Sequence, residues 1–243
     1  MTGSDCQYDA GRKAAQSAAG VTKVEIVGRA GYLHIEGRPG ASEIRADGQA
    51  CAPIEEELAG MALRATRSGS TVRIEAIVPD HEGTFFQSSP KLDFEVTVPA
   101  GIAVDVVDSS GELTVANVGD LKVEDSSGSI EIRHTTGNVR VRDSSGEIVI
   151  DDVRGDVYIP QDSSGDIEIR RVGGGVTIDE DSSGSIDIRD VQRNVNIGSD
   201  GSGSIDVTDI GGDFTVGSKG SGSVEYDNVR GRVSVPARHR HRD

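Results

Sequence analysis

A short unit of alternating aliphatic and polar residues repeats along the second half of the chain. One copy runs from Asp143 to Ile159, and its glycine, Gly146, has a counterpart in each of seven units. These marker glycines are Gly111, Gly128, Gly146, Gly165, Gly184, Gly203 and Gly222, at steps of 17 to 19 residues. A fixed period of this length is typical of stacked units that cannot bury a hydrophobic face singly.

Each unit contains two short runs in which every second residue is aliphatic. Counted from the marker glycine, the aliphatic positions are +2, +4, +7, +11 and +13; one unit holds Ile167, Ile169, Val172, Val176 and Ile178 there. Residues two apart share one face of a strand. We therefore predict an all-β fold, a parallel β-solenoid of about seven rungs of 17 to 19 residues over residues 108–236. Thr135 and Tyr226 depart from the pattern, and Tyr226 lies in the last rung, where its ring could close the core.

Residues 21–107 also carry strand patterns, and we expect them to form a β-rich capping region. Aliphatic residues alternate around Val24, Leu33 and Ile44, with glycine-containing turns between, which predicts a meander. Residues 1–20 are polar and rich in alanine, without clear periodicity, and are predicted to be an N-terminal tether.

One helix is predicted between these strands. Pro53 stands at a plausible first helical position, three glutamates follow, and Gly60 is a suitable end. A strand pair follows around residues 61–63 and 72–74, and residues 80–90 have the composition of a loop. Phe85 and Phe86 in that loop are expected to cover the end of the core, with a ligand-binding aromatic pair as the alternative.

The alternation of residues 92–98 and 102–106 continues into Asp108 without a linker. The N-terminal sheet should therefore continue into the solenoid and cover its first edge, as terminal units of repeat proteins must. At the other end, Pro236 and the basic tail at residues 237–243 should discourage another chain from pairing with the last rung.

Composition narrows the possible partners. The 243 residues carry a net charge of −16, which disfavours nucleic acid and anionic membranes as partners. No run of 18 apolar residues is present, so we expect no membrane span. Hydrophobic residues make up only 35% of the chain, which is enough where a thin core grows in one dimension.

The two cysteines, Cys6 and Cys51, lie outside the repeats. An even count favours a disulfide in an oxidising compartment, and two buried free thiols in a cytosolic protein are the alternative. Because no hydrophobic segment precedes Cys6, the disulfide reading implies an exported protein whose leader is missing from this sequence.

A column of acidic residues is the feature most open to a functional interpretation. Aspartates stand three residues before successive marker glycines, and Lys219 takes that place in the last unit; they are Asp108, Asp125, Asp143, Asp162, Asp181 and Asp200. Stacked carboxylates repel, so something must compensate. We expect each aspartate to accept hydrogen bonds from the serine and glycine amides of its own corner. A row of Ca²⁺ ions is the alternative, because hard cations bind several oxygen ligands.

A second set of acids alternates with arginines on the predicted outer face. Glu131, Glu168, Asp187, Asp206 and Glu225 recur there, with Arg133, Arg170 and Arg189 two residues further on. A solvated face with charge pairs between rungs is expected, and a docking stripe for a basic partner is the alternative. His34, His81 and His134 lie far apart in the sequence with no nucleophile motif beside them, so no enzyme is expected.

The Ser-Ser-Gly-x-aliphatic-x-aliphatic unit, entered from the alternating run at residues 92–98 and Pro99, resembles a known group. It is similar to bacterial envelope proteins grouped as a domain of unknown function and often labelled candidate adhesins. The resemblance covers residues 21–236 and implies a β-solenoid in the periplasm or at the cell surface, without an assigned catalytic residue or cofactor.

We therefore expect a non-catalytic, exported structural or adhesion module, monomeric, that binds an unidentified envelope protein or surface ligand. A calcium-dependent carbohydrate-binding or polysaccharide-cleaving β-helix, and a solenoid that polymerises end to end, are the alternatives.

Overall fold

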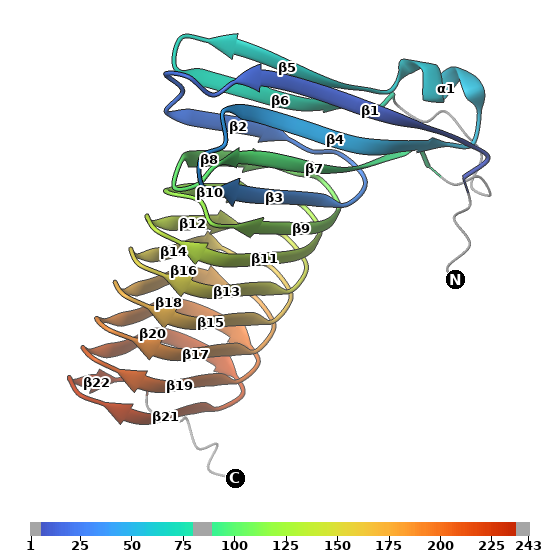
Figure 1. Ribbon diagram of the computed structural model, residues 1–243. Helices are drawn as coiled ribbons and strands as arrows, with labels where there is room; N and C mark the ends of the chain where they lie inside the picture. The colour runs from blue at the N-terminus through green and yellow to red at the C-terminus, as the bar shows by residue number, and fades with distance from the viewer. Residues whose placement is uncertain (1–5, 80–88, 237–243) are drawn as a thin grey trace.

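The computed structural model describes residues 6–79 and 89–236, which form two facing sheets and one helix (Figure 1). Each sheet has eleven strands. At ~4.8 Å per strand the ten steps between them span about 48 Å. The predicted all-β solenoid is confirmed.

The regular part of the solenoid alternates between the two sheets, one strand in each per rung. Sheet A receives β9 (Gly111–Ala116), β11 (Gly128–Thr135), β13 (Ile148–Val153), β15 (Ile167–Val172), β17 (Ile186–Val191), β19 (Ile205–Ile210) and β21 (Val224–Val229). Sheet B receives β8 (Ala103–Val107), β10 (Leu121–Glu124), β12 (Val139–Arg142), β14 (Val157–Gln161), β16 (Val176–Asp181), β18 (Val195–Ser202), β20 (Phe214–Ser221) and β22 (Val233–Ser234).

These strands stack in parallel with equivalent residues opposite each other. Ile148 pairs with Ile130 on one side and Ile167 on the other, and the whole column faces the core. The change from 18-residue to 19-residue units is absorbed by a bulge between β12 and β14, so the aliphatic positions stay in register. The predicted core positions are confirmed. Thr135 is buried among them, whereas Tyr226 remains 50% exposed over the last rung.

The marker glycines make the tight corner possible. At Gly165 φ is +132°, and a Cβ added there would lie 1.7 Å from the carbonyl oxygen of Gly146 in the preceding rung. No residue with a side chain fits this position, because the backbones of successive rungs touch there.

The N-terminal region adds strands to the same two sheets. Sheet A continues through β3 (Leu33–Arg38), β7 (Lys91–Pro99), β4 (Glu43–Ala52) and β1 (Tyr8–Ser17), and sheet B through β2 (Lys23–Val27), β6 (Thr71–Ile77) and β5 (Ala62–Ser68). Because β2 pairs with β8, and β3 with β9, the N-terminal sheet does continue into the solenoid, as predicted.

The predicted meander of consecutive strands is wrong. Strands β2 and β3 lie in opposite sheets and form an additional rung, stacked between the β6–β7 rung and the β8–β9 rung. At its corner, Gly31 occupies the marker position above Gly111, and its N–H donates to the carbonyl of Ser110 at 3.2 Å. The run Gly31-x-Leu33-x-Ile35 carried the signal of this rung, although Arg29 and Ala30 replace its serines.

The first strand and the helix close the N-terminal end. The tether prediction is wrong for Tyr8–Ser17, which form β1 and pair antiparallel with β4. The predicted helix is present as α1 (Glu55–Gly60), and β5 and β6 form the predicted antiparallel pair. Arg12 of β1 donates to the carbonyls of Met61 and Leu58, at 2.6 and 2.7 Å, which joins β1 to α1 and to the residue before β5.

Cys6 and Cys51 form the predicted disulfide, with their Cα atoms 5.4 Å apart. The disulfide joins the residue range just before β1 to the end of β4. These two strands already pair with each other there, with Tyr8 opposite Ala52. Phe85 and Phe86 fall outside the described residues. Nowhere in residues 6–79 and 89–236 is a helix long and apolar enough to cross a membrane.

Replacing a marker glycine by alanine should destabilise the fold far more than the same replacement at a glycine that also has positive φ but has open space around its Cα. Gly69 has φ of +59° and nothing within 4 Å of an added Cβ. Gly69→Ala should cost about 1 kcal/mol of unfolding free energy, and Gly165→Ala at least twice that, because two backbones must separate. Urea denaturation of both variants measures the difference; equal losses would contradict direct backbone contact at the corner.

Reducing the Cys6–Cys51 disulfide should loosen the cap and leave the rungs folded. The chain-entropy model gives about 4 kcal/mol for a loop of this size, and the solenoid buries its own core without a cysteine. Hydrogen exchange after reduction should accelerate in β1 and β4 but not in β13 to β17. Simultaneous loss of protection in all rungs would show that the cap and the solenoid unfold as one unit.

Candidate functional site

The aspartate column lies inside the molecule, along the corner between sheet B and sheet A. Register pairing places Asp162, Asp181 and Asp200 directly above one another. The solvent-exposed fractions are at most 7% for all six aspartates of the column. The spacing of these aspartates predicts a single column, and the structure adds that the column faces the core.

The first four aspartates of the column each bind their own turn through one carboxylate oxygen. The backbone N–H of the following serine donates to Oδ1 in the first four rungs, at 2.9 Å in Asp108, 2.8 Å in Asp125, 2.7 Å in Asp143 and 2.8 Å in Asp162. The expectation for the glycine amides is wrong. They donate to the serine carbonyl of the next rung instead, as Gly146 does to Ser164 at 2.9 Å, because the stacked backbones meet at that corner.

The second oxygen of these side chains has no hydrogen-bond partner. Oδ2 of Asp108, Asp125, Asp143 and Asp162 is buried and unpaired, as are both oxygens of Asp181. A buried carboxylate oxygen without a donor is costly when charged. The buried carboxylates must therefore be neutralised, either by bound protons or by a cation.

The column ends differently at its two extremities. Above Asp108 the equivalent position is Gly28, where a Cβ would lie 2.3 Å from Asp108 Oδ1. Below Asp200, Lys219 forms a buried ion pair with Asp200 Oδ2 at 2.8 Å and donates to the carbonyl of Gly203 at 2.8 Å. Gly28 thus leaves room for the carboxyl group of Asp108 at one end, and Lys219 neutralises the carboxylate of Asp200 at the other.

Burial raises the pKa values of the intervening aspartates. Desolvation raises the pKa of Asp108 and of Asp181 to about 7, and that of Asp125 and of Asp162 to about 6. In Asp108, Asp125 and Asp162 the hydrogen bond from the serine amide opposes the rise. Neighbouring aspartates raise them further, and desolvation raises the pKa of Asp143 as well. Protons are therefore bound to part of the column near neutral pH.

Protons suit this column better than calcium ions do. Ca²⁺ prefers six to eight oxygen ligands, whereas one oxygen of each of the first four aspartates is already bonded to a turn amide and the other faces the interior. Within residues 6–79 and 89–236, no three acidic, histidine or cysteine side chains converge as a metal site would require.

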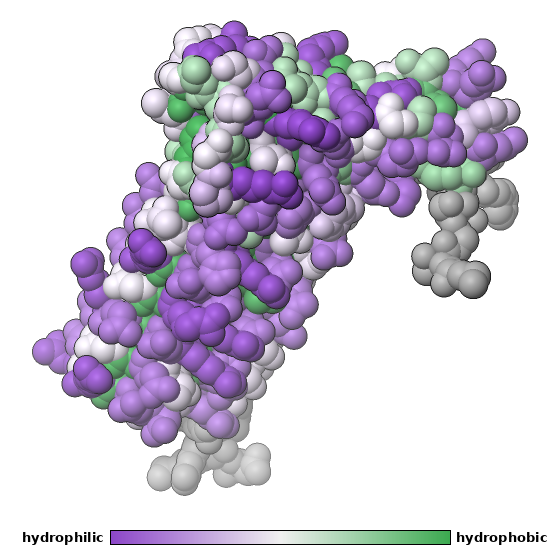
Figure 2. Space-filling model, in the orientation of Figure 1, coloured by the Kyte–Doolittle hydropathy of each residue, from purple (hydrophilic) through white to green (hydrophobic). Residues whose placement is uncertain are grey.

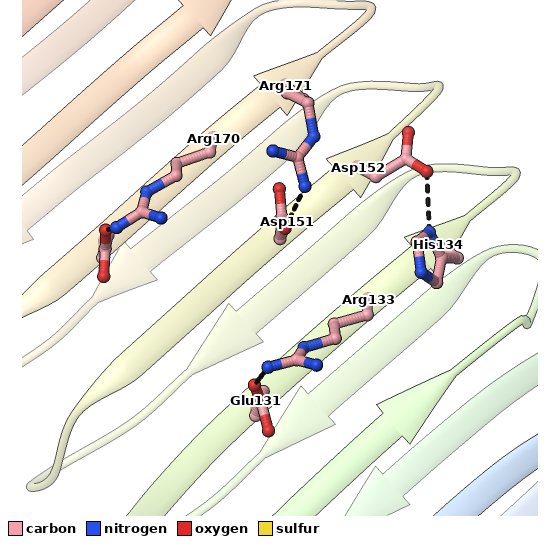
Figure 3. Close-up of polar contacts among 8 residues, drawn as sticks. Glu131, Arg133, His134, Asp151, Asp152, Arg170 and Arg171 are labelled. Atoms are coloured by element: carbon pink, nitrogen blue, oxygen red, sulfur yellow. Dashed lines mark hydrogen bonds and ion pairs between the residues drawn. The ribbon is translucent and has the colours of Figure 1, made fainter.

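The outer face of sheet A carries the second acidic set on β11, β15, β17, β19 and β21, whereas Val149 takes that position in β13. Figure 3 shows the part of this face across β11, β13 and β15. Arg133 pairs with Glu131 and Arg170 with Glu168, each within its own strand. The predicted pairing between rungs is wrong for these residues. Register stacking places Glu168 against Asp187 in the next rung, so the nearest opposite charge lies two residues along the same strand.

Ion pairs between neighbouring rungs occur at the second corner, near the ends of these strands. Arg171 pairs with Asp151, and His134 Nδ1 lies 2.7 Å from Asp152 Oδ2 (Figure 3). The column of residues that forms this corner was not predicted from the sequence. It consists of residues in the left-handed region, with φ of 50° to 61°: Asn117, His134, Asp152, Arg171, Asp190, Asp209 and Asn228. Asn or Asp stands six residues after five of the seven marker glycines, and this recurrence was the available signal, because these residues tolerate that conformation best.

A third polar column at the next corner was also missed. Asn138 Oδ1 accepts a hydrogen bond from the backbone N–H of Asp156 at 2.9 Å, and Asp156 Oδ1 accepts one from Gly175 at 2.8 Å. These side chains bond the backbone of the next rung, so their role is structural. The two histidines in the described part of the chain lie apart: His34 of β3 stacks on Tyr32, and His134 lies in β11. His81 is outside the described residues.

The aspartate column should make the protein more stable in acid than at neutral pH. Because the folded protein holds these groups at raised pKa values, it binds more protons than the unfolded chain, which titrates near 4. The contribution of the column to the unfolding free energy should be greatest below about pH 4 and be lost as the pH rises through 6 to 7. Melting temperatures measured between about pH 4 and pH 8 test this.

Two substitutions separate the contributions. Asp162→Asn keeps the turn acceptor without the charge and should raise the melting temperature near pH 8 but not near pH 4. Asp162→Ala loses the turn cap and should cost about 1 kcal/mol at both. Asp206→Asn, on the surface, is the control. Equal flattening of the pH profile by Asp206→Asn would assign the effect to net charge, and a sharp rise with Ca²⁺ in the parent but not in Asp162→Ala would assign the column to metal binding.

Solved structures of similar architecture come from bacteria. A candidate adhesin from Bacteroides fragilis is 17% identical, with a TM-score of 0.47, and the match covers 95% of this chain and 98% of that one. A candidate cell-adhesion protein from Clostridium sporogenes is 13% identical, with a TM-score of 0.44, covering 94% and 100%. No curated protein matches the chain. The model of the Toastrack DUF4097 family matches residues 52–227, and the chain therefore belongs to the Toastrack DUF4097 family.

Proposed function

We propose that the protein is a non-catalytic, exported interaction module of the bacterial cell envelope, with a structural or adhesive role. The observation that best supports this role is the outer face of sheet A, where charged residues recur from rung to rung along the solenoid. Figure 2 shows that the visible side of the solenoid is predominantly hydrophilic. Such a face suits an extended partner better than a small molecule, which prefers an enclosed apolar pocket.

The energetics of this face support an interaction role. The side chains of Arg133 and Arg189 are 54% and 56% exposed, and each pairs only with an acid two residues away. Exposed pairs of this kind contribute about 0–1 kcal/mol to stability. The fold therefore gains little from the regular charges, which remain available to a partner.

The disulfide supports an extracytoplasmic location, because such bonds persist in oxidising compartments. It joins two strands of the cap that already pair, so it reinforces an end that would otherwise fray. The calcium-dependent carbohydrate alternative gains no support from the column, whose free oxygens face the interior. End-to-end polymerisation gains none from β22, which is only two residues long.

Localisation and thiol state in the native bacterium test the proposal. Alkylation of intact cells with a membrane-permeant maleimide should leave Cys6 and Cys51 unmodified unless the sample is first reduced, and fractionation should place the protein in the periplasm or at the surface. Purified protein should also bind isolated envelopes saturably, and added salt should weaken that binding. Recovery in the cytoplasm with both thiols alkylated would overturn the proposal.

A further inference from the structure

The two ends of the solenoid are finished differently. At the N-terminal end, side chains of β1 and β5 bond across the gap between the sheets: Gln16 donates to the carbonyl of Ala65 at 3.4 Å, and Arg67 to that of Ala19 at 2.7 Å. Together with α1, the Arg12 contacts and the disulfide, these bonds close that end. Antiparallel strands and basic side chains such as Lys13 also interrupt the parallel pattern there.

The C-terminal end is not closed in this way by the residues described. Strands β21 and β22 are the last strands of their sheets, so each has one backbone edge without a strand partner among residues 6–79 and 89–236. Tyr226 of β21 is 50% exposed and lies over the buried ring of Phe214, 6.0 Å between centroids. The aliphatic residues of this last rung are partly buried and pack against the core: Val224, Val229, Val233 and Val235.

The same strand carries acids that have lost their arginines. In the column of outer-face acids, Glu168 and Asp187 pair with Arg170 and Arg189. The arginine position holds Thr208 in β19 and Asp227 in β21, so the last strand carries an acid at both positions. Among the described residues, Glu225 and Asp227 make no ion pair. Both are exposed, and both stand on the outer side of β21, on either side of Tyr226.

This arrangement disfavours pairing between two copies of the chain. If two β21 strands met antiparallel about Tyr226, Glu225 of each copy would lie opposite Asp227 of the other. Shifting the register by two residues places Glu225 opposite Glu225, or Asp227 opposite Asp227. Like charges directly opposite one another destabilise a strand pair. The edge is therefore protected against self-association but not against a strand of opposite charge.

We propose that β21 is a docking edge for an extended segment of another polypeptide that carries Lys or Arg at alternate positions, with apolar residues between them. The proposal rests on the interaction role proposed above and names the chemistry of the partner. Addition of a strand to an exposed edge gains affinity from backbone hydrogen bonds and specificity from alternate side chains. Basic side chains would lie opposite Glu225 and Asp227, and the intervening apolar side chain would cover Tyr226 and shield Phe214.

Binding of a short designed peptide to the full-length protein tests this directly. The probe is acetyl-Thr-Val-Lys-Val-Lys-Val-Thr-amide, and the controls are its Glu-for-Lys analogue and a scrambled peptide with adjacent lysines. The probe should slow amide exchange in β21, and not in β1 or β5, and should bind more weakly as salt is added. Equal binding of the Glu analogue, equal binding of the scrambled peptide, or protection elsewhere would overturn the proposal.

Charge reversal at the edge provides the matched test. Glu225→Lys with Asp227→Lys should weaken binding of the probe about tenfold, because two cross-strand pairs change sign, and should favour the Glu analogue. The same reversal at Glu131, paired with Arg133 far from the end, should leave binding unchanged. Circular dichroism and the melting temperature show that the last rung remains folded in each variant.

The single variant Glu225→Lys gives an independent result. In the register centred on Tyr226, each new lysine would lie opposite Asp227 of the other copy, so this variant should dimerise in sedimentation experiments while the parent stays monomeric. A dimeric parent would assign the edge to a second copy and overturn the proposal.

Replacing Arg238, Arg240 and Arg242 by serine should leave binding of the probe intact, because the probe is held by β21. Loss of probe binding in this variant would also overturn the proposal. None of these outcomes depends on the cellular location, which tests the proposed function separately.

Discussion

In-register parallel stacking is the constraint on which the rest of the structure depends. Each residue lies about 4.8 Å from its equivalent in the next rung. For Ile and Val this produces a continuous core, as in the column through Ile130, Ile148 and Ile167. For charged and bulky residues it creates a conflict that the sequence must relieve at every rung. The polar features of the molecule are the ways in which it does so.

Three solutions appear at different places on the rung. At the tight corner, where the carbonyl of one rung meets the Cα of the next, only glycine is accommodated. On the outer face, acids that stack on acids find arginines two residues along the same strand. Inside the corner no arginine is present, and the buried aspartates instead hold protons until Lys219 closes the column. The outer-face arrangement ends before the last two rungs, where Thr208 and then Asp227 stand in place of the arginine, and the edge of the last strand is acidic.

Sequence periodicity predicted the solenoid because its signal is repeated seven times, so that the loss of one position, as at Thr135, does not hide it. It failed where the repeat occurs once. Residues 23–38 form a rung whose corner reads Gly-Arg-Ala-Gly, and its place in the stack is fixed by pairing with strands from residues 71–77 and 103–107. Strand β1 alternates only between half-buried and exposed small or polar residues, so no hydrophobic signal marked it. The depth of the aspartates was not predictable, because a turn of Asp, Ser and Gly has the same sequence whether its carboxyl group points to water or to the core.

The protonated column is the central claim, and the side-chain carboxyl ¹³C shifts of the aspartates test it most directly when followed from about pH 3 to pH 9. The structure predicts that Asp108, Asp125, Asp162 and Asp181 titrate between about 6 and 7, as coupled groups. Asp47, which pairs with Arg45, should titrate below the ordinary range and serves as the internal reference. Titration of all four column residues near pH 4 would show that the carboxylates are charged and solvated in the folded protein, and would contradict their place in the core.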